Sequence, residues 1–347
     1  MAKLYVFNPE HDLALASNLS NFTSPLAGRK LRHDIGFIPA LWVGDDDYVL
    51  VDDVDYASMA YRQLSEELGL KPKQFVDKTQ LHHLYINKVE PWGWDLALRS
   101  FLLRHGVDAV PDEDEIATIR DLSHRRQAAS LLPKLQMPGT AGLSVEAVSM
   151  ADVGQMLNIH RNIVVKAPWS SSGRGVRFIV DAIDSYQERW IVNVIEKQGS
   201  VMVEPFYDKV KDFGMEFESD GEGHVSYLGL SLFDTKNGAY TGNLIAAENV
   251  KQRALDEYRI PVCAVREKIC DVLGREFLEK YKGPFGVDMM VVRTAEGGLL
   301  LHPCVEINLR RTMGHVALAI EPFADGVARM MQVTKRENEF AVTLSLI

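Results

Sequence analysis

Phosphate-binding chemistry is indicated by one short stretch near the middle of the chain. A β-branched run at 163–165 ends in Lys166, and an Ala-Pro-Trp turn leads from it to a polar loop. The loop consists of Ser170, Ser171, Ser172, Gly173, Arg174 and Gly175. Glycine lets backbone N–H groups approach an anion, serine adds hydroxyl donors, and the two cationic side chains add charge. The stretch predicts a strand, a hairpin loop and a strand, which is either a polyanion-binding loop or an ordinary solvated hairpin.

Metal-binding chemistry is indicated by two apolar runs near the C-terminus. They flank a Glu-Gly-Gly turn at 296–298, which predicts a β-hairpin. Strand alternation puts Glu306, Asn308 and Arg310 on one face, and a pairing whose residue numbers sum to an even value adds Asp288 to that face. Two carboxylates and an amide oxygen suit Mg²⁺, which prefers oxygen ligands. The alternative is a solvent-facing hairpin, which apolar neighbours on the Asp288 face disfavour.

The first 110 residues alternate short apolar runs with amphipathic stretches. Strands are expected near 4–7, 48–51 and 74–76, and helices near 25–33, 56–68 and 94–104. Regular alternation of strands and helices favours a mostly parallel sheet. This stretch is therefore expected to form an α/β unit that positions the chemistry described above.

A polar segment, Asn8 to Asp12, directly follows the first expected strand. Ligands of α/β folds bind at the carboxyl ends of strands, so the segment is a candidate wall of a substrate pocket, with His11 as a catalytic candidate. The alternative is a turn in which Asp12 caps a short helix. The run Pro-Trp-Gly-Trp-Asp at 91–95 favours a packed turn that leads into a helix.

Residues 111–205 differ in character from the first unit. After an acidic run, a helical stretch is expected to continue through Arg125 until Pro133 breaks it. Further on, Glu204 and Phe206 lie at the end of an expected strand. A carboxylate and an aromatic ring at such an exit suit an adenine amino group, a ribose hydroxyl and a base face, or belong to an interdomain turn.

The composition excludes several classes of protein. The chain has 347 residues, of which 46% are hydrophobic and 25% charged, as in folded globular proteins. A formal net charge of −10 argues against a general binder of the nucleic-acid backbone. The three cysteines lack metal-ligand spacing, and their odd count suits a reducing compartment, so a cytoplasmic location is expected. No apolar stretch is long enough to span a bilayer, so no membrane or export role is expected.

In this order, the motifs resemble those of the ATP-grasp superfamily, which contains carboxylate–amine ligases and related enzymes. The similarity covers roughly residues 115–325, and the α/β unit before it resembles the N-terminal domain of that family. The resemblance implies an α/β protein in which an N-terminal α/β domain precedes a two-lobed ATP-grasp fold. It implies this domain at 1–110, a small lobe with a glycine-rich flap at 111–205, and a large lobe with the Mg²⁺ site at 206–347.

The resemblance also implies roles for individual residues. Lys166 and the flap from Ser170 to Gly175 match the groups that hold the ATP phosphates, and Glu204 with Phe206 matches the adenosine site. The Mg²⁺ ligands match Asp288, Glu306 and Asn308. Arg310 resembles a residue that faces the reacting phosphoryl and acyl groups, so Arg310 and Lys166 are the expected catalytic residues. Arg125 is a departure, because it stands where the family usually has a phosphate-binding lysine, and the two side chains differ in geometry.

The implied reaction is ATP-dependent C–N bond formation, in which a carboxylate is activated as an acyl phosphate and attacked by an amine. The implied cofactors are ATP and Mg²⁺, the partners are small-molecule carboxylates and amines, and a homodimer is allowed. An ATP-grasp kinase that phosphorylates a small-molecule acceptor, or a non-catalytic nucleotide-binding protein, remains an alternative.

Candidate substrate contacts lie on either side of the expected metal hairpin. They are Lys236, Tyr240, Arg311 and His315. The loop at 234–243 suits either a substrate or a plain surface position. His315 is either an acid–base group or a structural hydrogen-bonding residue.

Overall fold

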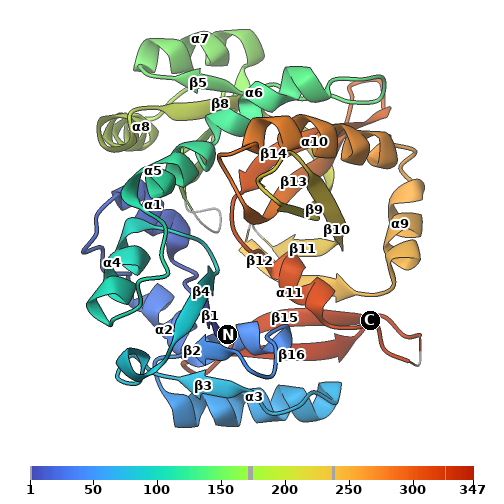
Figure 1. Cartoon of the computed structure of the whole chain (residues 1–347). Coiled ribbons are helices and arrows are strands. Elements are labelled where there is room, and N and C mark those ends of the chain that lie inside the picture. The colour runs from blue at the N-terminus through green and yellow to red at the C-terminus, as the bar shows by residue number, and fades with distance from the viewer. Residues whose placement is uncertain (1, 171–174, 237–238, 325) are drawn as a thin grey trace.

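The structure is a computed structural model that describes residues 2–170, 175–236, 239–324 and 326–347. Of the predicted flap, Ser171, Ser172 and Gly173 lie outside the described residues, whereas Ser170 and Gly175 are described. In Figure 1 most of the first 110 residues lie in the lower part of the view together with the C-terminal end of the chain, and the middle part of the chain lies above them.

The N-terminal unit is built on a parallel sheet with strand order β3-β2-β1-β4. Its strands are β1 (Ala2–Val6), β2 (Tyr48–Leu50), β3 (Gln74–Val76) and β4 (Ile86–Pro91). Its helices are α1 (His11–Ser17), α2 (Leu26–Ile35), α3 (Val54–Leu68) and α4 (Leu96–Arg104), with 3-10 turns η1 (Ile38–Leu41) and η2 (Leu81–His83). The predicted parallel α/β arrangement is confirmed. The sequence did not predict β4, because this edge strand carries exposed polar residues and ends in proline.

Two motifs that are far apart in the sequence meet above this sheet. Asn8 Nδ2 donates to the carbonyl of Gly93 (2.8 Å) and to Asp95 Oδ2 (3.1 Å), and Asp95 Oδ1 caps α4 by accepting from the amide of Leu98 (2.9 Å). His11 is buried, and its ring packs against Gly93 so closely that a Cβ there would lie 2.7 Å from three ring atoms. The run at 91–95 is thus a packed turn, as predicted.

The expected cap at Asp12 is wrong. Glu10 occupies the N-cap position of α1 and makes no side-chain capping bond, while Asp12 lies inside the first turn of the helix. The physical reason is that the Asp12 carboxylate is directed at a guanidinium of another unit, described below.

The predicted helix through Arg125 is also corrected. The stretch forms two helices, α5 (Glu113–Leu122) and α6 (Arg126–Leu135). The helix is interrupted because side chains bond the backbone between the two: Ser123 Oγ donates to the carbonyl of Ile119 at the end of α5 (2.7 Å), and His124 Nδ1 accepts from the amide of Arg126 at the start of α6 (3.0 Å). Pro133 lies inside α6 instead of ending it. The buried apolar face of α6 outweighs the local cost of the proline.

The sheet that carries Lys166 has strand order β5-β8-β6-β7 and is antiparallel. Its strands are β5 (Val145–Ala147), β6 (Asn162–Lys166), β7 (Val176–Val180) and β8 (Val201–Pro205). The helices α7 (Met150–His160) and α8 (Ser185–Gln198) share a core with Val165 and Val203, so Lys166 and Glu204 occupy the opposite face. The predicted hairpin of β6 and β7 is confirmed by its register.

The sheet that carries the acidic hairpin has strand order β10-β9-β13-β14. Its strands are β9 (Asp208–Ser219), β10 (Val225–Ser231), β13 (Gly283–Arg293) and β14 (Leu299–Asn308), with α9 (Glu248–Asp256) and α10 (Val262–Phe277) alongside. β13 pairs with β14 so that Asp288 lies directly opposite Glu306, after a register shift between Asp288 and Met290; the predicted shared face is confirmed.

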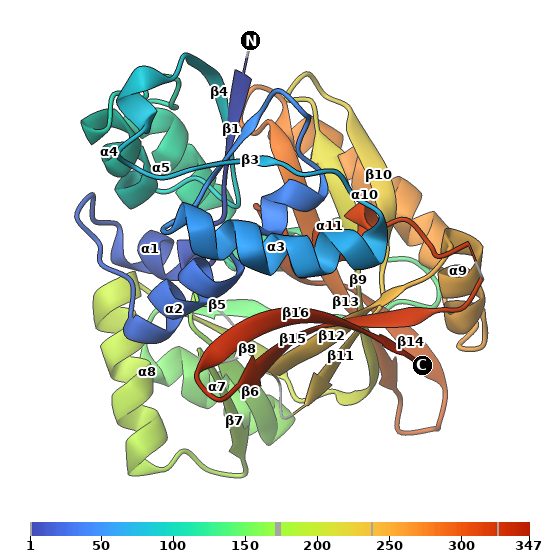
Figure 2. The same cartoon turned by 90° about the horizontal axis from the view of Figure 1, so that it is seen from below.

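The last sheet has strand order β11-β12-β15-β16, and its core includes residues of the N-terminal unit. The elements are β11 (Phe233–Lys236), β12 (Ala239–Ile245), β15 (Arg329–Arg336), β16 (Glu339–Leu346) and the helix α11 (Met313–Ala319). Met331 and Val316 pack in one cluster with Tyr5 and Ile35. Both views show β15 and β16 beside the N-terminal unit (Figures 1 and 2). The domain boundaries near residues 110 and 205 stay a prediction.

The tight packing at Gly93 gives a stability prediction. Gly93→Ala should lower the free energy of unfolding by roughly 1–3 kcal/mol, because the added methyl group overlaps the buried His11 ring. The matched control is Gly154→Ala in α7, where a Cβ meets no described heavy atom within 4 Å; it should raise stability by about 1 kcal/mol. Urea denaturation measures both, and equal shifts in the two variants would contradict the prediction.

Candidate active site

The small-lobe face of the candidate site carries a buried ion pair. Lys166 Nζ lies 2.6 Å from Glu204 Oε2, and both side chains are buried. The pair forms because β6 and β8 are neighbours and present these side chains on the face away from α7 and α8. Phe206 is 52% exposed and packs edge-on against Phe178. The structure therefore brings together Lys166 and Glu204, the predicted phosphate and adenosine residues.

The turn after β6 is closed by a contact that requires glycine. The amide of Ala167 donates to the carbonyl of Gly175 (2.8 Å), and a Cβ at Gly175 would lie within 2.3 Å of Ser170 side-chain atoms. The described ends of the predicted flap thus lie together at the top of the strand that carries Lys166.

The large-lobe face carries the predicted Mg²⁺ ligands. Asp288 and Glu306 are direct cross-strand neighbours, and Asn308 Nδ2 donates to Asp288 Oδ2 (3.1 Å). Burial, with the nearby charges of Glu306 and Glu216, raises the pKa of Asp288 to about 7. Crowded carboxylates of this kind favour a cation between them.

The donor set fits Mg²⁺ only with further ligands. No group of three or more His, Cys, Asp or Glu side chains within the described ranges is disposed to hold a metal ion. Asp288, Glu306 and Asn308 provide hard oxygen atoms, and Mg²⁺ commonly completes its octahedron with water and substrate phosphates. The residues fit a metal that arrives with a nucleotide.

Arg125 connects the two faces. Its guanidinium donates to Ser170 Oγ (2.8 Å), to the carbonyl of Ala167, and to Glu306 Oε1 (2.7 Å). The side chain is buried. One residue thus joins the turn after β6 to β14, and the role of Arg125 in place of a phosphate-binding lysine stays a prediction.

Arg310 is held from the N-terminal unit. Its Nε donates to Asp12 Oδ1 (3.0 Å) and its NH2 to Asp12 Oδ2 (2.8 Å) and to Asn308 Oδ1 (3.0 Å). Burial lowers the pKa of Arg310, but the nearby carboxylates, Asp12 first among them, raise it by more, so the net shift is upward and the guanidinium stays charged. The sequence did not predict a contact between Asp12 and Arg310. It indicated Asp12 only as part of the polar segment after the first strand, which is a candidate pocket wall or a local turn.

His302 is a second residue that the sequence analysis did not assign. It is fully buried on β14, packs edge-on against Tyr207, and has its pKa lowered to about 4 by burial, so its ring is neutral near pH 7. The charge of Glu204 raises this pKa and that of Lys166 lowers it, both less than burial does. The sequence feature that could have pointed to His302 is its even spacing from Glu306 along β14, which puts both side chains on one face of the strand.

The predicted substrate residues lie on different elements. The amide of Arg311 donates to the carbonyl of Trp92 (2.8 Å) at the border of the N-terminal unit. His315 is buried in α11, with Nδ1 2.9 Å from Glu216 Oε2. Tyr240 lies on β12, and burial raises the pKa of its hydroxyl. Lys236 is the last residue of β11, and its side chain lies outside the described part of the structure. Their substrate roles stay predictions.

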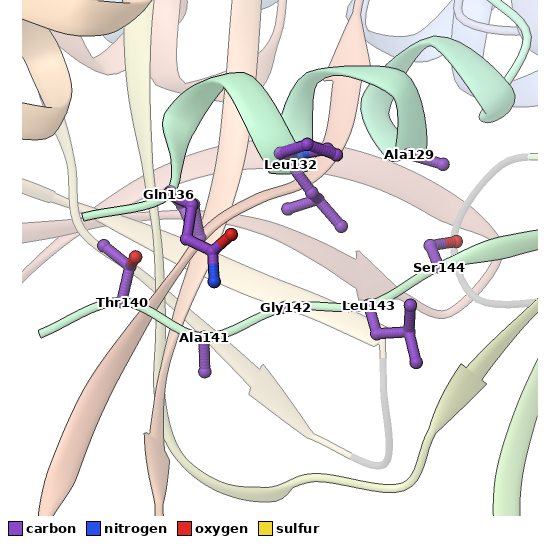
Figure 3. Close-up of a pocket in the computed structure, with 10 residues that line it drawn as sticks. Ala129, Leu132, Gln136, Thr140, Ala141, Gly142, Leu143 and Ser144 are labelled. Carbon is purple, nitrogen blue, oxygen red and sulfur yellow. The ribbon is translucent and has the colours of Figure 1, made fainter. Parts of the chain in front are cut away.

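A separate cavity of about 230 Å³ lies between α6 and the segment 140–144 (Figure 3). The ten residues that line it include Ala129, Leu132 and Gly142 but none of the predicted site residues. Gly142 separates it from His302, since a Cβ there would lie 3.0 Å from the imidazole Nε2. Its volume is below the roughly 300–1,000 Å³ typical of ligand pockets, so it does not mark a nucleotide site.

Comparison with known proteins identifies the fold of the chain. No family model matches the sequence, and no curated protein sequence is detectably similar to it. The fold is similar to N5-carboxyaminoimidazole synthetase from Staphylococcus aureus in complex with ADP (TM-score 0.51, 12% identity, 96% of this chain and 82% of that one). It is also similar to a biotin carboxylase complex with β,γ-ATP from Campylobacter jejuni (TM-score 0.52, 12% identity, 98% and 77%). The chain has the ATP-grasp fold. Among the described helices, none combines the length and the apolar character needed to cross a membrane.

The raised pKa of Asp288 gives a pH-dependent stability prediction. In metal-free buffer between about pH 4 and about pH 7, Asp288 is protonated in the folded protein and ionised in the unfolded chain. The contribution of Asp288 to the free energy of unfolding is therefore lost as the pH rises through that range. Asp288→Asn cannot ionise and should become more stable than the wild type as pH rises from about 5 to about 8. Urea denaturation in chelator measures this, with the exposed Asp46→Asn as control. Parallel stability profiles for wild type and Asp288→Asn would contradict the assignment.

Proposed function

We propose that this protein is an ATP- and Mg²⁺-dependent ligase that activates a carboxylate as an acyl phosphate for attack by an amine. The observation that carries the proposal is the 2.7 Å contact between Arg125 and Glu306, because it joins the predicted phosphate-binding face to the predicted metal face in one site. Lys166 lies on the first face, and Asp288 and Asn308 lie on the second.

The similar structures support the general reaction class. Their names describe a synthetase in complex with ADP and a carboxylase in complex with β,γ-ATP. At 12% identity the likeness establishes the fold alone, so the reaction is proposed here from the side chains.

The chemistry requires charge compensation and positioning. A carboxylate is a poor electrophile because its carbon is attached to delocalised negative charge. Transfer of the γ-phosphoryl group to a carboxylate oxygen releases ADP and gives an acyl phosphate, and attack of an amine at the acyl carbon then expels inorganic phosphate and releases a proton. In this proposal Lys166 and Arg125 bind the phosphates, and Arg310 faces the reacting phosphoryl and acyl groups and offsets the charge that develops during transfer.

The metal would be held by Asp288, Glu306 and Asn308, and when bound it supplies the divalent charge that neutralises the phosphates. Glu306 would hold the metal in place of its contact with Arg125, and the Arg125 guanidinium would then be available to a phosphate oxygen. Glu204 and Phe206 are proposed to border the adenosine, since the Glu204 carboxylate lies at the Lys166 ammonium group and Phe206 follows at the exit of the same strand.

Nucleotide binding tests the first half of this proposal. Lys166→Ala and Glu306→Gln should each weaken MgADP binding by roughly 10–100-fold, the loss expected for one charge-assisted contact. Isothermal titration calorimetry measures the affinity, and circular dichroism checks that each variant is folded. The control is Lys134→Ala, which removes an exposed lysine paired with Glu276 away from the site. Unchanged affinity in both site variants would contradict the assignment.

Turnover tests the second half. Wild-type protein, MgATP and pools of amino acids and small carboxylates should release phosphate and yield an amide that mass spectrometry identifies. Glu306→Gln should lower turnover at least a hundredfold. A phosphorylated product without free phosphate would instead support the kinase alternative and exclude the ligase reaction.

A further inference from the structure

The bidentate contact between Asp12 and Arg310 connects residues that are 298 positions apart in the sequence. Both side chains are 17% exposed, and the two parallel N–H to oxygen contacts measure 3.0 and 2.8 Å. Such a fork fixes the plane of a guanidinium as well as its position. Asp12 therefore determines the orientation of Arg310 more completely than a single hydrogen bond would.

The remaining contacts of Arg310 leave that orientation incomplete. NH2 also donates to Asn308 Oδ1 (3.0 Å), and NH1 donates to the carbonyl of Arg311 (3.2 Å). Both partners lie within two residues of Arg310, so they move with the same strand end. Asp12 is the described partner that comes from a different unit.

Asp12 is itself rigidly placed and charged. It lies in the first turn of α1, next to His11, which is locked against Gly93 and lies near Asp95. Although burial raises the pKa of Asp12, Arg310 lowers it more strongly, and His11 and Arg125 lower it further, so the carboxylate stays ionised.

We propose that Asp12 is a positioning residue of the active site: it orients Arg310 toward the reacting phosphoryl and acyl groups, so that the N-terminal unit takes part in catalysis. This inference rests on the proposed function. It requires Asp12 to act on the chemical step and to leave nucleotide binding, which uses Lys166 and Arg125, nearly unchanged.

The kinetic test compares Asp12→Asn, which keeps the shape but removes the charge, with Asp12→Glu, which keeps the charge. With the substrate pair found in the turnover screen, Asp12→Asn should lower kcat by roughly 10–100-fold, while the KM for ATP stays within about threefold. Asp12→Glu should recover part of the loss. The matched control is Asp45→Asn, which breaks the 2.7 Å pair with Lys73 in the same unit, away from the site, and should leave kcat unchanged.

A mutant cycle tests whether Asp12 acts through Arg310. In an Arg310→Lys background, Asp12→Asn should cause less than about a threefold further loss of kcat, because the fork is already absent. Full additivity would overturn the positioning role, as would an unchanged or increased kcat in the single Asp12→Asn variant.

A spectroscopic readout is independent of turnover. In protein labelled with ¹⁵N-arginine, the Arg310 Nε–H resonance, assigned by its loss in Arg310→Lys, should exchange slowly with water in the wild type and rapidly in Asp12→Asn. Fast exchange in the wild type would overturn the inference. A wild-type protein that shows the slow resonance but neither binds MgADP nor turns over ATP would contradict the proposed function instead.

Discussion

The candidate site depends on ion pairs that are largely removed from water and that join different parts of the chain. They are Lys166 with Glu204, Arg125 with Glu306, and Arg310 with Asp12. An ionised group in such surroundings needs an opposite charge, because leaving it unpaired costs roughly 3–5 kcal/mol. The first pair joins two strands of one sheet, the second joins the start of α6 to β14, and the third joins α1 of the N-terminal unit to the segment that follows β14. The pairs therefore require three units to meet at one point.

Asp288 differs from these carboxylates, because among the described residues its hydrogen-bond partner is the amide of Asn308 and not a cation. Burial and the neighbouring carboxylates Glu306 and Glu216 therefore raise the pKa of Asp288. A nucleotide alone would bring negative charge toward Glu306, and a divalent cation alone would leave Arg125 without its carboxylate. Phosphate and Mg²⁺ together match both signs, so electrostatics favours their joint binding.

The features that the sequence predicted are those that a short-range rule determines. Strand alternation is sufficient to put Asp288 and Glu306 on one face of the hairpin, because side chains alternate with a period of two, whereas their direct opposition also depends on a register shift between Asp288 and Met290 that the turn does not determine. The helix break before Arg126 was missed because it depends on the hydrogen bonds of His124, and Asp12 was assigned to a local cap because aspartate commonly occupies that position. Its actual partner, Arg310, is determined by packing between units, on which local propensity carries no information.

That packing explains how a contact between residues so distant in sequence can be precise. Asp12 follows Phe7 and β1, while Arg310 precedes α11, which carries Val316. Phe7 and Val316 belong to the same buried cluster, so the elements on both sides of the contact are anchored in one core. A change in the angle between the N-terminal unit and α11 would have to disrupt that core before it separated the two charges. Apolar packing beneath the site therefore holds α1 and the segment before α11 in place. The ion pair with Asp12 then fixes the position of the Arg310 guanidinium.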